Sequence, residues 1–123
     1  MIAVDTSSLR RFLAGERGRD VDLVIGAIGE GRAILPPPVL CEALSDPAIP
    51  ADLSRDLAGL PLLEIRDGYW RRAGLLRGRV IAAGRKAKLA DALIAQCCID
   101  HQVALITNDR DFRHFVPQGL TLA

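Results

Sequence analysis

Short apolar runs alternate with longer amphipathic segments along this 123-residue sequence, and the alternation restricts the fold more than any other feature. We expect strands at residues 2–4, 32–35, 61–65 and 103–107, with an edge strand at 119–122. We expect helices at 6–15, 20–31, 36–47, 49–60, 67–84 and 88–101, and a short helical turn at 108–115. Strands separated by helices need right-handed crossovers, which give a mainly parallel sheet with helices on both faces. The pattern therefore predicts one α/β domain over residues 1–123, with a sheet of four to five short strands.

The spacing of apolar residues also predicts which side chains are buried. The helix at 20–31 has an apolar side formed by Val21, Val24, Ile25 and Ile28. The helix at 88–101 has one formed by Leu89, Leu93, Ile94 and Cys97. The chain has three cysteines, of which Cys97 and Cys98 are adjacent. This is a poor basis for disulfides, so we expect reduced, buried thiols.

The composition indicates a folded protein that does not enter a membrane. Half of the residues are hydrophobic, a quarter are charged, and no apolar run is long enough to cross a bilayer. The N-terminus lacks the pattern of an export signal, so we expect a cytoplasmic protein. The net charge is only +1, so a nucleic-acid partner would have to bind a local basic cluster. Such clusters are formed by Arg71, Arg72, Arg77 and Arg79 and by the stretch 85–88, although taken alone a solvated helix face explains them better.

Four acidic residues fall near one predicted edge of the sheet. Asp5 ends the first strand, and Asp109 follows the strand at 103–107. Glu42 and Asp91 lie early in helices that begin beside the same edge, where parallel α/β sheets carry their sites. Four carboxylates near one point cannot all stay ionised without a cation, and oxygen ligands favour Mg²⁺ or Mn²⁺. Such ions activate water and stabilise the leaving oxygen of a phosphodiester.

Each acid also has a purely structural explanation. Asp5 or Thr6 can cap the first helix, Asp91 suits the helix dipole of a first turn, and Asp109 can cap the turn that follows it. Glu42 is harder to explain in this way, because its helix is mostly apolar. A cap formed by Thr6, with Asp5 free to bind a metal, satisfies both interpretations of the first helix.

The segments IAVDTSSL, PPPVLCEAL and ADALIAQCCIDHQVALITNDRDFRHF resemble the PIN-domain family, and more narrowly its VapC-type toxin ribonucleases. The resemblance extends over essentially the whole chain. It implies a PIN-like sandwich and a metal-dependent endoribonuclease of a type II toxin–antitoxin system, which cleaves RNA. It also implies a homodimer that is inhibited by a cognate antitoxin, whose tail covers the site.

The resemblance assigns roles to individual residues. Asp5, Glu42, Asp91 and Asp109 match the four acids that bind Mg²⁺ or Mn²⁺. Supporting roles fall to Thr6, Ser7, Thr107 and Asp111. The stretch before Asp91 is more basic than is usual for the family, so Lys86 and Lys88 either contact substrate phosphates or are simply solvated.

Other classes of protein fit less well. A phosphatase with an aspartyl nucleophile needs an acid where this chain has Ser7, and a receiver domain needs a late lysine, whereas Lys88 is the last one. The sequence contains no phosphate-binding P-loop motif. The remaining alternative is a PIN domain that binds RNA or protein with little or no nuclease activity. Tyr69 and Trp70 could stack on a base, but an aromatic pair on a helix is more often part of a core or an interface.

Overall fold

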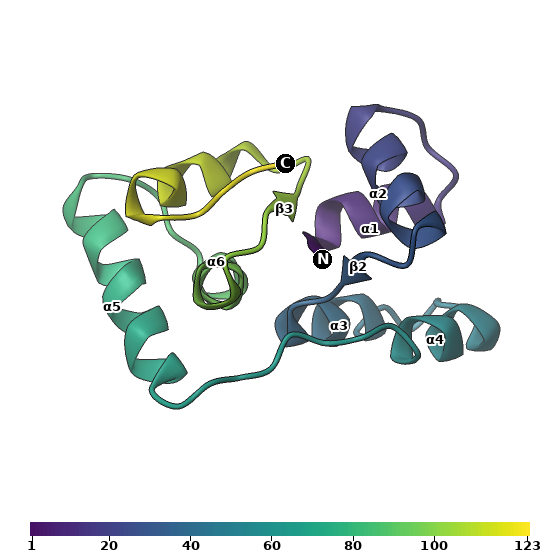
Figure 1. Cartoon of the computed structure of the whole chain (residues 1–123), viewed down its shortest axis with the longest axis horizontal. Coiled ribbons are helices and arrows are strands. Elements are labelled where there is room, and N and C mark those ends of the chain that lie inside the picture. The colour runs from purple at the N-terminus through teal and green to yellow at the C-terminus, as the bar shows by residue number, and fades with distance from the viewer.

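The computed structural model describes all 123 residues, which form a small parallel sheet with helices on both sides (Figure 1). The strands are β1 (Ile2–Val4), β2 (Ala33–Ile34) and β3 (Leu105–Ile106). Their order is β2-β1-β3, and β1 pairs in parallel with both neighbours. Because all three run the same way, the residues that follow β1 and β3 emerge at the same edge. The predicted α/β class and parallel sheet are confirmed.

Two further segments extend this sheet by one bridge each. Leu62 lies in parallel beside Leu35, and Leu122 lies in parallel beside Leu105. The predictions of full strands at 61–65 and 119–122 were therefore wrong, because these segments make only isolated bridges. In the first, Pro61 has no N–H group and can only accept, which it does from the Leu35 N–H at 2.9 Å.

The predicted helices are all present, with modest differences at their ends. They are α1 (Thr6–Leu13), α2 (Arg19–Gly29), α3 (Pro37–Leu44), α4 (Ala51–Ala58), α5 (Tyr69–Ala82) and α6 (Leu89–His101). The turn expected at 108–115 is a 3₁₀ helix, η1 (Arg110–Gln118). Figure 1 shows α1 and α2 on one side of the strands and α5, α6 and η1 on the other.

The buried core centres on β1, β3 and α6. The side chains of Val4 and Ile106 are almost completely buried, as are Cys97 and Cys98, which confirms the prediction for these two thiols. Cys41 is exposed, so the expectation of three buried thiols was wrong at this position. It lies on the outer side of α3, whose buried residues are Val39 and Ala43.

Three residues predicted to face the core are exposed. Ile25 and Ile28 are 53% and 37% exposed, because α2 presents Val21, Val24 and Ala27 to the interior at a spacing of three residues. Leu89 is 58% exposed, because it is the first residue of α6 and precedes the part of the helix that enters the core.

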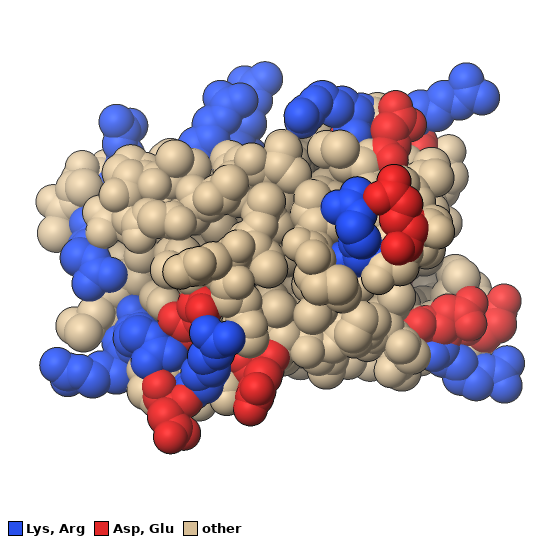
Figure 2. Space-filling view, viewed as in Figure 1, with Lys and Arg blue, Asp and Glu red and all other residues tan.

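The surface carries charges of both signs without one dominant field. On the face shown in Figure 2, charged side chains lie mainly around the rim and the centre is mostly uncharged. None of the helices combines the length and the apolar character that a membrane-spanning helix requires.

Candidate metal centre

Asp5 lies at the carboxyl end of β1, where it is buried and held by hydroxyl groups. Its Oδ2 accepts hydrogen bonds from the Ser7 hydroxyl at 2.7 Å and the Thr107 hydroxyl at 2.8 Å. The Ser7 N–H also points to this oxygen, at 3.4 Å, so Asp5 itself caps α1. The expectation that Thr6 forms the cap was wrong: the Thr6 hydroxyl donates to Glu42 Oε1 at 2.8 Å instead. Burial raises the pKa of Asp5, and the hydrogen bonds from Ser7 and Thr107 only partly oppose this effect.

The loop after β3 is tied to the start of α1 by the same two hydroxyl groups. The Asn108 N–H donates to the Ser7 oxygen at 3.1 Å, and the Asp109 N–H donates to the Thr107 oxygen at 3.0 Å. The Asp109 carboxylate then accepts from the Asp111 N–H at 2.9 Å and caps η1. Each hydroxyl therefore both holds Asp5 and positions the backbone that carries Asp109.

Asp91 enters the site from the first turn of α6 and is 9% exposed. Its Oδ2 is buried and has no hydrogen-bond partner. Burial raises the pKa of Asp91 to about 6, with further contributions from the negative charges of Asp109 and Asp5, and Lys88 opposes the shift. A buried carboxylate oxygen without a partner is costly, which indicates that something absent from the chain itself completes this site.

Three carboxylates meet at this point. Asp91, Asp109 and Asp111 each offer an oxygen within 4.8 Å of the others. Asp5 lies close enough to affect the pKa of Asp91 but is not one of these three. Glu42 also lies outside the trio, on α3, where Thr6 holds it.

The prominence of Asp111 was not anticipated, because the sequence assigned it only a supporting role. Its position follows from the cap at Asp109: the Asp111 N–H bonds back to Asp109, which keeps the two residues close together. The sequence did contain a signal for this position, because Asp111 is an acidic residue two positions after the capping residue Asp109. Lys86 lies nearby, with its Nζ 3.8 Å from Asp111 Oδ2, whereas Lys88 makes no ion pair.

The residues present fit a hard divalent cation. All the ligand atoms in the trio are carboxylate oxygens, which Mg²⁺ and Mn²⁺ prefer to the nitrogen and sulfur ligands of softer metals. The unpartnered Asp91 oxygen and the raised pKa of Asp91 are what a site built for a positive charge shows in the absence of that charge.

The fold and this acidic centre define an α/β protein with a cluster of carboxylates at the carboxyl edge of its parallel sheet, and comparison with known families gives its family. The PIN domain family matches residues 2–116, so the chain belongs to that family. PIN domains are generally nucleases that typically use divalent metals. Comparison with curated proteins gave no match.

Proposed function

We propose that this PIN domain is a cytoplasmic, metal-dependent endoribonuclease of the VapC toxin type, which hydrolyses RNA phosphodiester bonds. The observation that carries the proposal is the buried, unpartnered Asp91 Oδ2 beside Asp109 and Asp111 in a PIN fold. An acidic residue that only stabilised the first turn of a helix would be expected to face solvent or to accept a hydrogen bond from the backbone.

In this proposal Asp5, Glu42, Asp91 and Asp109 hold Mg²⁺ or Mn²⁺, and Asp111, whose carboxylate lies beside those of Asp91 and Asp109, supports them. The ion, when bound, activates water and neutralises charge on the phosphodiester. The protein's own contribution is orientation: Ser7 and Thr107 fix Asp5, and Thr6 fixes Glu42. Lys86 and Lys88 contact phosphates of the RNA substrate beside the site.

Cleavage of RNA by the purified protein tests the proposal. We expect cleavage that requires Mg²⁺ or Mn²⁺, stops with chelator, and falls by at least about 100-fold in Asp91→Asn. Asp52→Asn is the matched control, because Asp52 also lies in the first turn of a helix but is exposed on α4. Full cleavage by Asp91→Asn, or cleavage unaffected by chelator, would contradict the proposal.

We also propose that the chain forms a homodimer and binds a cognate antitoxin. An exposed apolar groove next to Glu42 supports a protein contact of this kind: it is lined by Pro37, Ile65 and Leu93, and by Trp70, which is 69% exposed. Sedimentation should give twice the mass of one chain, and a monomer at micromolar concentration would contradict the dimer.

The alternative is a PIN domain that binds RNA or protein with little or no nuclease activity. Tight RNA binding without cleavage, unchanged by chelator, would establish that alternative.

A further inference from the structure

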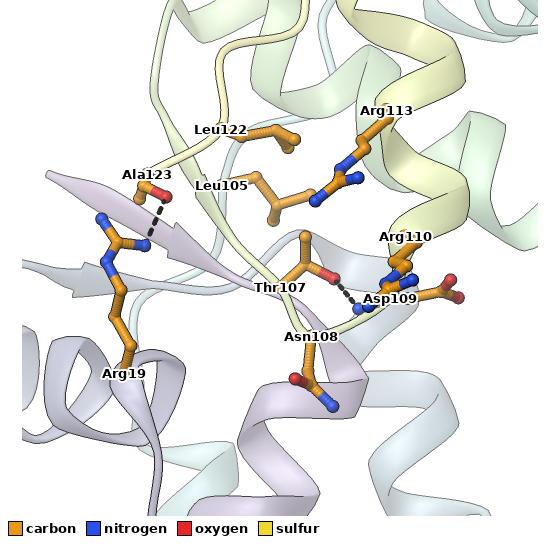
Figure 3. A pocket seen from close by; sticks show the side chains of 9 residues that line it. All are labelled: Arg19, Leu105, Thr107, Asn108, Asp109, Arg110, Arg113, Leu122 and Ala123. Carbon is orange, nitrogen blue, oxygen red and sulfur yellow. Dashed lines mark hydrogen bonds between the residues drawn. The ribbon is translucent and has the colours of Figure 1, made fainter.

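A polar hollow of about 260 Å³ opens beside the acidic centre (Figure 3). Thr107, Asn108 and Asp109 form its floor, at the point where the chain leaves β3. Arg19, from the start of α2, lies on one side, and Arg110 and Arg113, from η1, lie on the other. The lining therefore has three arginine side chains and one acidic side chain, that of Asp109, and Arg19 donates a hydrogen bond to the Ala123 backbone oxygen at 3.3 Å.

The helix type explains why two of these arginines lie together. A 3₁₀ helix has three residues per turn, so side chains at i and i+3 lie in line along the same side. Arg110 and Arg113 have this spacing in η1 and both line the hollow. In Figure 3, Arg113 extends toward Leu105 and Thr107.

These two side chains are also free, unlike several arginines on α5. Arg110 and Arg113 are exposed, donate none of the protein's hydrogen bonds and lie in none of its ion pairs. By contrast, Arg72 pairs with Asp100 at 2.7 Å, and Arg77 donates to the Ala87 carbonyl at 2.9 Å. Arg72 and Arg77 therefore stabilise the fold, whereas Arg110 and Arg113 are available to a ligand.

We infer that this hollow binds a backbone phosphate of the RNA strand, next to the phosphate at the acidic centre. The inference rests on the proposed nuclease function and specifies where the substrate lies. Guanidinium groups bind phosphate through paired, charge-assisted hydrogen bonds, and Arg110 and Arg113 present two of them.

Asp109 links the two sites, because it belongs to the acidic trio and also lines the hollow. A strand with one phosphate at the trio thus places a neighbouring phosphate against the arginines. A nucleic acid meets this requirement because it carries a charge at every nucleotide. A strand whose phosphodiester lies at the trio, as the proposed nuclease function requires, carries its next phosphate past the hollow, so the continuity of the two sites favours RNA.

Binding measured without metal tests this inference apart from catalysis. A labelled single-stranded RNA 12-mer is titrated with protein in EDTA and followed by fluorescence anisotropy at several salt concentrations. We expect Arg110→Ala/Arg113→Ala to bind about 10-fold more weakly and to reduce the slope of log K against log salt by about 0.7, since the hollow holds one phosphate and each neutralised phosphate of a single strand adds about 0.7 to the slope. The control is Arg55→Ala/Arg71→Ala, which removes the same charge from exposed positions on α4 and α5.

The outcomes separate this inference from the proposed function. The inference would be overturned if the η1 variant, Arg110→Ala/Arg113→Ala, bound RNA as tightly as the parent protein. It would also be overturned if the control lost as much affinity, or if the parent protein bound no RNA. Binding of polyglutamate as tight as that of RNA, with the same dependence on Arg110 and Arg113, would overturn it in favour of an acidic polypeptide. Loss of RNA binding in the η1 variant alone supports it, even if the parent protein cleaves nothing and the nuclease proposal fails.

Discussion

Thr107 connects two of the acids through one hydroxyl group. It donates to Asp5 Oδ2 at 2.8 Å and accepts from the Asp109 N–H at 3.0 Å. The sequence could place Asp5 and Asp109 at one edge, because parallel strands deliver their ends together. It could not show that Thr6 bonds to Glu42, 36 residues away, because that contact depends on how α3 packs against α1.

Replacing Thr107 with valine tests this connection. The change keeps the shape of the side chain but removes both hydrogen bonds, so Asp5 loses a donor and its already raised pKa rises further. We expect the free energy of unfolding to fall by about 1–2 kcal/mol and RNA cleavage to fall about 10-fold. Urea unfolding and a cleavage assay measure the two effects.

Thr121→Val is the control for this experiment, because Thr121 is exposed and its side chain makes no hydrogen bond. Equal behaviour of the two variants would show that the Thr107 hydroxyl does not support the site.

Helices α1 and α2 are joined through one carboxylate. Asp20, in the first turn of α2, accepts from the Ser8 hydroxyl at 2.8 Å and from Arg11 Nε at 3.1 Å. The order and type of the helices could be predicted, because each carries its own apolar period and end signals. The sides of the helices that are buried were predicted less well, because the whole fold decides which neighbour packs against a helix. Ile25 and Leu89, for example, were predicted to face the core and are exposed.

Asp20 makes stability depend on pH in the acid range. Burial alone would raise the pKa of Asp20, but the hydrogen bonds from Ser8 and Arg11 outweigh it and lower the pKa below its ordinary value of 3.8. The unfolded chain therefore takes up this proton first, and the contribution of Asp20 is complete above its unfolded pKa and lost as the pH falls through the lowered value.

Urea unfolding at several pH values between about 5 and 3 measures this contribution. We expect Asp20→Asn to be less stable than the parent at pH 5, with a difference that shrinks toward pH 3. Asp22→Asn is the control, since Asp22 is exposed in the same turn. A constant difference across this pH range would contradict the linkage.

For the molecule as a whole, local patterns were enough to predict a parallel sheet between helices but not its full width. Strands β1, β2 and β3 form as expected, whereas Leu62 and Leu122 add only single bridges. A short apolar run does not reveal how many of its backbone groups will find partners, because the partners come from segments distant in the sequence.

Thiol labelling reports on the integrity of this core. Cys97 and Cys98 are buried in α6, and burial raises the pKa of both thiols, whereas Cys41 is exposed. We expect a thiol reagent to label one cysteine per native chain rapidly and the other two only at the rate of unfolding. Cys41→Ser should abolish the rapid phase, and rapid labelling of all three cysteines would contradict the packing of α6.

The whole proposal for this site depends on one claim, that Asp91 and the acids around it bind a divalent cation. Calorimetric titration of Mn²⁺ into the metal-free protein measures this binding. We expect stoichiometric binding to the parent protein and to Asp52→Asn, and none to Asp91→Asn. We also expect metal-free Asp91→Asn to be at least as stable as the parent, because the substitution removes an unpartnered charge that Asp109 and Asp5 repel. Mn²⁺ binding to Asp91→Asn with the affinity of the parent would show that these acids do not form a metal centre around Asp91.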